Sequence, residues 1–118
     1  MKNLILFTLI FFACGKQDVL LQKCWTLAEP GENFQIFYPC GDERLRPTRF
    51  SPAYEFYADK QCRYKILSPN DSHNFKDGTY NYNVQKSTLD VMNVEGDLVA
   101  QFKILEITEE QLKVKVLE

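Results

Sequence analysis

The sequence predicts an all-β domain, an antiparallel meander of about eight short strands closed into an up-and-down β-barrel. Short runs of alternating apolar and polar residues are separated by turn residues, which is typical of antiparallel strands. No stretch keeps an amphipathic helical period for ten residues with caps, so no large helix is expected. No long crossover segment interrupts the series, and closure of the barrel would remove exposed strand edges.

The expected strands follow one another from residue 22 to residue 117. In the last of them, Leu112, Val114 and Val116 alternate with two lysines, so this strand has one apolar face and one wet face. Gly96 lies in a turn between two strands and tolerates a positive φ there. The eight expected strands lie at 22–28, 34–38, 54–57, 62–66, 80–85, 89–91, 98–107 and 112–117.

Length and charge exclude several classes of protein. A chain of 118 residues provides one domain and no second core. The 14 Lys and Arg residues nearly balance the 16 Asp and Glu residues, which excludes the strongly basic surface of a nucleic-acid-binding protein. The hydrophobic content of 45% excludes a disordered chain.

The first residues indicate an export signal rather than part of the fold. Lys2 precedes an apolar run over 4–13 that would be about 15 Å long as a helix, too short to span a bilayer. Ala13 before Cys14 resembles a bacterial lipoprotein signal, in which the cysteine is lipidated and becomes the new N-terminus. An ordinary signal cut near Ala13, which leaves Cys14 as a free thiol, is the alternative. The expected division is signal peptide 1–13, tether 14–20 and barrel domain 21–118.

Lipid on Cys14 would hold the protein at a bacterial membrane, because several acyl chains give a stable anchor. We therefore expect an exported protein on the outer membrane, at its periplasmic face or at the cell surface.

Short motifs in the rest of the chain suggest a family. They are Cys24-Trp25, Arg49-Phe50-Ser51-Pro52, the segment 67–73, Gly78-Thr79-Tyr80, and the closing segments 102–104 and 112–114. With these motifs the chain resembles small bacterial lipoproteins with a lipocalin-like domain, a mostly uncharacterised family, over residues 21–117. The resemblance implies a lipocalin-like β-barrel with a binding cup, and it does not imply catalysis.

Export would place the cysteines in an oxidising compartment. With Cys14 taken by lipid, the other three allow one disulfide and one free thiol. We expect a bridge between Cys40 and Cys62, because Cys40 follows Pro39 in an irregular segment that could lie over a sheet end. Alternatives are a Cys24–Cys40 bridge and three reduced, buried thiols. No pair has the short spacing of a structural zinc site, so no metal is expected.

The aromatic residues of the expected interior bear on ligand binding. A tyrosine-rich interior is typical of a hydrated cup, but we favour a filled core over a cup. Asp71 and His73 lie two residues apart in an expected loop, where they would either line the barrel mouth or sit in a turn capped by Asx hydrogen bonds. The ligand-binding residues that we expect are Trp25, Tyr64, Tyr80, Tyr82, Asp71 and His73.

Residues 42–50 contain three arginines and two acids. Guanidinium groups can bind an anion, but such a run is more often a solvated loop with one Arg packed over an aromatic ring. We expect packing here, with Arg49 over Trp25.

Two functions remain open at this point. The first is a membrane-anchored envelope lipoprotein whose barrel binds a small apolar or amphipathic ligand without catalysis or a cofactor. The second is a filled barrel that acts as a structural or protein-interaction module and docks on an envelope protein. Val99 and Leu105, apolar residues on the polar side of their strand, favour the second. No enzyme is expected, because no nucleophile motif such as G-x-S-x-G occurs.

Overall fold

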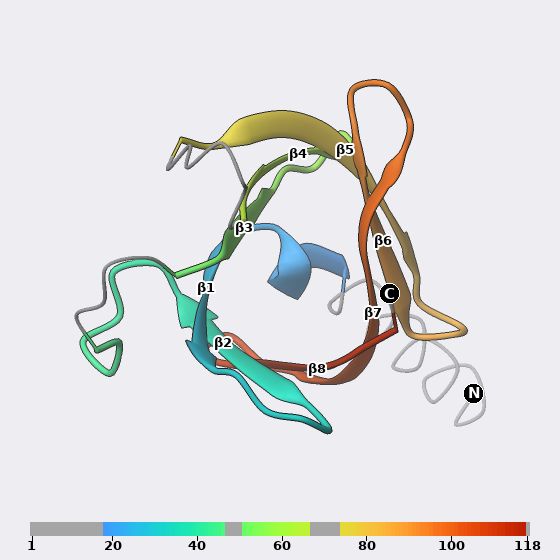
Figure 1. The fold of residues 1–118 in the computed structure, drawn as a ribbon. Helices are drawn as coiled ribbons and strands as arrows, with labels where there is room; N and C mark the ends of the chain where they lie inside the picture. Colours follow the sequence, from blue (N-terminus) through green and yellow to red (C-terminus); the bar gives the residue numbers. More distant parts are fainter. Residues whose placement is uncertain (1–17, 47–50, 67–73, 118) are drawn as a thin grey trace, which may run out of the picture.

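The computed structural model describes residues 18–46, 51–66 and 74–117. Over these ranges the chain forms a closed antiparallel barrel of eight strands, which confirms the predicted fold class (Figure 1). A single helical turn at residues 18–21 precedes the barrel. The strands are β1 (Cys24–Glu29), β2 (Gln35–Pro39), β3 (Ala53–Phe56), β4 (Gln61–Lys65), β5 (Lys76–Asn83), β6 (Thr88–Asn93), β7 (Leu98–Ile107) and β8 (Leu112–Val116).

The strand order departs from a simple meander at one place. The strands β3 to β8 follow the chain around the wall, but β1 lies between β2 and β3. Cys40 N donates to Cys24 O (3.0 Å) at the start of β1, and Leu27 N donates to Pro52 O (2.9 Å) farther along it. The chain therefore passes from one side of β1 to the other between Cys40 and Pro52. The expectation that each strand pairs with the next is wrong for β2 and β3.

The disulfide joins Cys24 to Cys40, so the predicted Cys40–Cys62 bridge is wrong. Side chains alternate along a strand, and because Trp25 is buried in the core, Cys24 points outward. Cys40 follows the neighbouring strand β2, and the two Cα atoms are 5.4 Å apart, within the usual range. Cys62 points inward as a buried free thiol, and the barrel wall separates it from Cys40.

Two β-bulges explain the apolar residues that break the alternation in β7. The pairing of β7 with β6 skips Val99, and its pairing with β8 skips Leu105. A bulge adds one residue and resets the alternation, so Ile104 and Ile107 both pack with the core although they are three residues apart. Val99 also packs against the core, whereas Leu105 is 48% exposed. Of the two residues, only Leu105 presents an apolar surface to solvent.

Aromatic rings fill the middle of the barrel. Tyr54 of β3 and Phe102 of β7 come from opposite walls, because three strands separate β3 from β7 on either side. Their ring centroids are 5.5 Å apart in an edge-to-face arrangement. Phe37 of β2 contacts both rings, at 5.9 and 6.2 Å. Rings at these separations are in direct contact, so side chains occupy the bore at this level.

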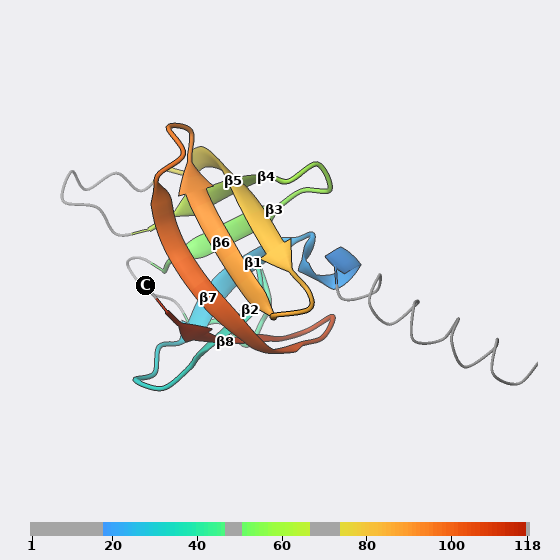
Figure 2. The same cartoon turned by 90° about the vertical axis from the view of Figure 1, so that its right-hand side faces the viewer.

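The helical turn closes one end of the barrel, which we call the helix end (Figures 1 and 2). Leu21 and Trp25 are fully buried there, and the indole Nε1 donates to Leu21 O (3.1 Å). Lys23 Nζ lies 5.3 Å from the centroid of the Trp25 ring and donates to Glu109 O (2.9 Å) in the turn between β7 and β8. Leu21 therefore acts as a plug that the indole holds in place.

Gly78 allows β5 to pack closely between its neighbours. A Cβ atom at this position would collide with Met92 O of β6 and press against the ring of Tyr64. The ring of Tyr64 thus takes the place of a side chain at Gly78.

We expect the substitution Cys40→Ser to lower the free energy of unfolding by roughly 3 kcal/mol, because the bridge restricts the conformations open to the unfolded chain. Urea unfolding followed by tryptophan fluorescence would measure the loss. Reductant should lower the parent protein to the level of the variant and leave the variant unchanged. In denaturant without reductant, alkylation should modify Cys62 but neither Cys24 nor Cys40; protection of Cys62 would contradict this pairing.

Candidate functional site

Of the predicted ligand-binding residues, the four that the structure describes do not line one common cleft. Trp25 is fully buried and its indole is hydrogen-bonded within the chain, so it has a structural role. Tyr80 and Tyr82 line a cleft at the helix end, whereas Tyr64 lines another cleft at the opposite end. The predicted set therefore does not form one common cup.

Other predictions concern residues outside the described ranges. The signal peptide 1–13, the lipidation site Cys14, and the pair Asp71 and His73 all lie there, and these predictions stay predictions. Within the described ranges, no helix combines the length and apolar character needed to cross a membrane. In the same ranges, no three side chains of the His, Cys, Asp and Glu types lie close enough together to bind a metal ion.

The cleft at the helix end has a volume of about 380 Å³. Its lining combines Tyr80 and Tyr82 of β5 with the carboxylate of Asp18 and the ammonium group of Lys60. The Tyr80 hydroxyl donates to Tyr57 O, so a protein group already uses it. Burial, with a smaller contribution from Asp18, raises the pKa of the Tyr82 hydroxyl.

The cleft at the opposite end, of about 480 Å³, is lined by Tyr64, Phe75 and Val94 together with charged residues. Arg63 and Lys65 place their cationic groups 5.1 and 5.5 Å from the centroid of the Phe75 ring. The aromatic contacts across the bore lie between this cleft and the one at the helix end. The two clefts are therefore separate surface sites.

The arginine run packs onto the wall at Arg44. Its guanidinium lies 3.8 Å from the centroid of the Tyr38 ring and forms two hydrogen bonds, of 2.9 and 3.0 Å, to the carboxylate of Asp42. It also donates to Glu110 O (2.8 Å). Hydrogen bonds from the side chain and backbone of Arg44 lower the pKa of Asp42 to about 2. Packing rather than anion binding is thus confirmed for Arg44, while Arg49 lies outside the described residues.

Cys62 and Tyr54 are two of the titratable groups buried in the core, beside Tyr64 and Tyr80. Burial raises the pKa of the Cys62 thiol to about 11, and burial with a smaller contribution from Cys62 raises the pKa of Tyr54 to about 12. The Cys62 thiol therefore stays protonated at neutral pH and is a poor nucleophile. Because the folded protein holds these protons more tightly than the unfolded chain, the stability that they contribute is full below about pH 9 and falls as the pH rises toward 12.

We expect Tyr54→Phe to make the protein less sensitive to alkali. The variant lacks one group that must lose a proton, so near pH 12 it should lose about 2 kcal/mol less of its stability than the parent. Urea unfolding at neutral pH and at a series of alkaline pH values would measure this difference. Equal losses in the two proteins would show that Tyr54 titrates normally in the fold.

Comparisons with known proteins do not assign a function to this chain. No family model matches the sequence, and no curated protein or solved structure is significantly similar to it. The sequence pattern, the filled barrel and the surface of this chain are therefore the basis for inferring its function.

Proposed function

We propose that this protein is a membrane-anchored envelope lipoprotein whose barrel is non-catalytic and serves as a structural or interaction module. The contact between Tyr54 and Phe102 across the bore is the observation that carries the proposal. An eight-stranded barrel has an interior just wide enough for side chains or for one small ligand. Because aromatic rings occupy that space, binding is left to the outer surface and the barrel ends.

The anchoring part of the proposal is supported by the Ala13–Cys14 pattern and by the short distance from Cys14 to the fold. Three residues separate Cys14 from Asp18, the first residue that the structure describes. Four peptide steps extend over at most about 14 Å. A lipid on Cys14 would therefore hold the helix end of the barrel close to the membrane surface.

A second candidate function is the binding of a small amphipathic molecule at the helix-end cleft. The cleft is lined by the partly exposed Tyr82 together with Asp18 and Lys60. Ligand sites commonly combine aromatic surface with a few polar groups. Such a molecule would co-purify with the chain from its own membrane and be seen by native mass spectrometry.

We expect xenon to leave the barrel amides of the parent protein unperturbed, because a filled bore offers no dry cavity. The variant Phe102→Ala should bind xenon, since removal of the ring opens a cavity, and should lose about 3–5 kcal/mol of stability. Two-dimensional NMR of both proteins under xenon pressure would locate any binding by residue.

One outcome would contradict a filled barrel, and another would favour the second candidate function. Saturable xenon shifts in β3 and β7 of the parent would reveal a cup in the bore. Co-purification of a small molecule that Tyr82→Ala abolishes would instead favour the second candidate. The more conservative variant Phe102→Leu serves if Phe102→Ala does not fold.

Lipid attachment predicts that the parent chain incorporates labelled palmitate in a Gram-negative host and sediments with the membranes. The substitution Cys14→Ser should abolish the label, because no other residue can become the lipidated N-terminus. Cys62→Ala, which removes a thiol from the core, is the matched control and should keep the label. A Cys14→Ser chain that keeps its label would contradict the anchoring part of the proposal.

A further inference from the structure

Charged residues that face each other across neighbouring strands differ between two parts of the outer wall. Glu55 of β3 faces Arg63 of β4, and Arg63 faces Asp77 of β5, so these pairs have opposite signs. Lys103 of β7 faces Lys115 of β8 instead. Like charges directly opposite each other destabilise a sheet. Between β7 and β8, these two facing residues thus carry like charges, whereas the facing pairs of β3, β4 and β5 carry opposite charges.

Neighbouring acids do not neutralise the lysine pair. Among the described residues, neither lysine of the pair has a carboxylate within 4.0 Å of its ammonium group. The carboxylate of Asp90 on β6 accepts a hydrogen bond from Gln101 (2.9 Å). Glu106 of β7 faces Lys113 in the strand register and accepts a hydrogen bond from Gln111 (3.2 Å). Both acids keep their negative charge, so three lysines and Glu106 leave this side of β7 and β8 with a net positive charge.

Further positive charge and apolar surface lie next to the pair. Lys113 precedes Lys115 by two residues on the same side of β8, and its ammonium group lies 4.2 Å from the centroid of the Phe34 ring. Leu105 and Leu117 each follow one lysine of the pair by two residues, and their side chains are 48% and 41% exposed. We call this surface the cationic wall, and it consists of Lys103, Lys113, Lys115, Leu105 and Leu117.

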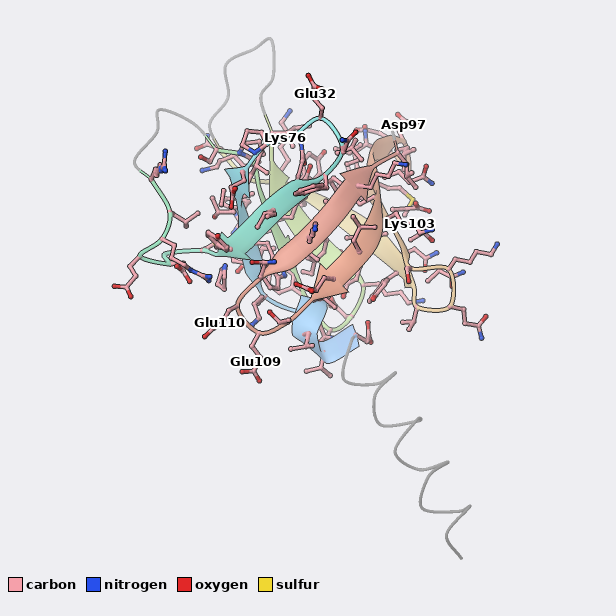
Figure 3. All side chains as sticks on the ribbon, turned by 90° about the horizontal axis from the view of Figure 1, so that it is seen from below. Glu32, Lys76, Asp97, Lys103, Glu109 and Glu110 are labelled. Carbon is pink, nitrogen blue, oxygen red and sulfur yellow. A yellow bond between two sulfur atoms is a disulfide. The ribbon has the colours of Figure 1, made fainter. Side chains whose placement is uncertain are left out.

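The acidic side chains labelled in Figure 3 lie away from Lys103. Glu109 and Glu110 lie beside the helical turn, and Glu32 and Asp97 lie at the opposite end of the barrel, whereas Lys103 lies between the two ends (Figure 3). The labelled acids thus lie toward the two ends of the barrel, where Lys76 also lies.

We propose that the cationic wall docks on the anionic headgroups of a phospholipid membrane. Three lysines complement a negative surface, and the two exposed leucines can enter the boundary between headgroups and acyl chains. A peptide partner would need a groove or a free strand edge. The closed barrel has no free edge, and the clefts lined by described residues do not include these lysines. A broad anionic surface fits the wall better.

Vesicle binding of the full chain tests this inference independently of lipid attachment, if Cys14→Ser is present in every protein compared. The probes are vesicles of phosphatidylcholine alone and vesicles that also contain phosphatidylglycerol. Each lysine near an anionic membrane contributes about fivefold to binding at low salt, so the Lys103→Gln/Lys115→Gln variant should bind the anionic vesicles about 30-fold more weakly. Binding to phosphatidylcholine should not change, and the variant should be at least as stable, because it loses a repulsive pair.

The matched control is Lys76→Gln/Lys86→Gln, which removes the same charge from exposed positions outside the wall. It should keep most of the binding to anionic vesicles. Equal losses in the two variants would reduce the effect to net charge and overturn the proposal. So would equal binding of the parent to both kinds of vesicle. Binding of the parent to polyglutamate but not to anionic vesicles would overturn it in favour of an acidic protein partner.

Discussion

The contact of aromatic rings across the bore is the constraint on which the rest of this structure depends. Tyr54 and Phe102 meet from opposite walls, and Phe37 contacts both. An eight-stranded barrel has little interior volume, so one such layer is enough to fill it at that level. With Leu21 plugging the helix end, the interior serves stability, and recognition falls to the clefts and the outer wall.

Much of the barrel could be predicted from the sequence, because alternation shows which side chains of a strand face the core. Alternation does not show which strand lies beside which, and this is why the crossing of β1 was missed. The disulfide was misassigned for the same reason. Alternation places Cys24 outside the barrel and Cys62 inside, but the position of Cys40 depends on β2 lying next to β1.

The candidate site was less predictable than the fold. Inward parity was correct for the buried Tyr64 and Tyr80, but parity does not give the height of a residue along the barrel axis. Height depends on register and strand tilt, and it places Tyr64 at one end and Tyr82 at the other. The two apolar residues that break the alternation in β7 have another explanation. Val99 and Leu105 mark β-bulges and do not form one continuous apolar patch.

The outer wall of a filled barrel can tolerate like charges on facing residues of neighbouring strands. Repulsion between two exposed lysines is weak, because water and salt screen it, and a well-packed core tolerates the small cost. The same exposure leaves the charges of Lys103 and Lys115 available to a partner, whereas Arg44 has its charge paired with Asp42 and its plane stacked on Tyr38. The positive charges of this protein therefore lie in two kinds of environment. Near β2, the charge of Arg44 holds a loop against the barrel wall. On β7 and β8, the lysine charges face solvent, where a negative surface can contact them.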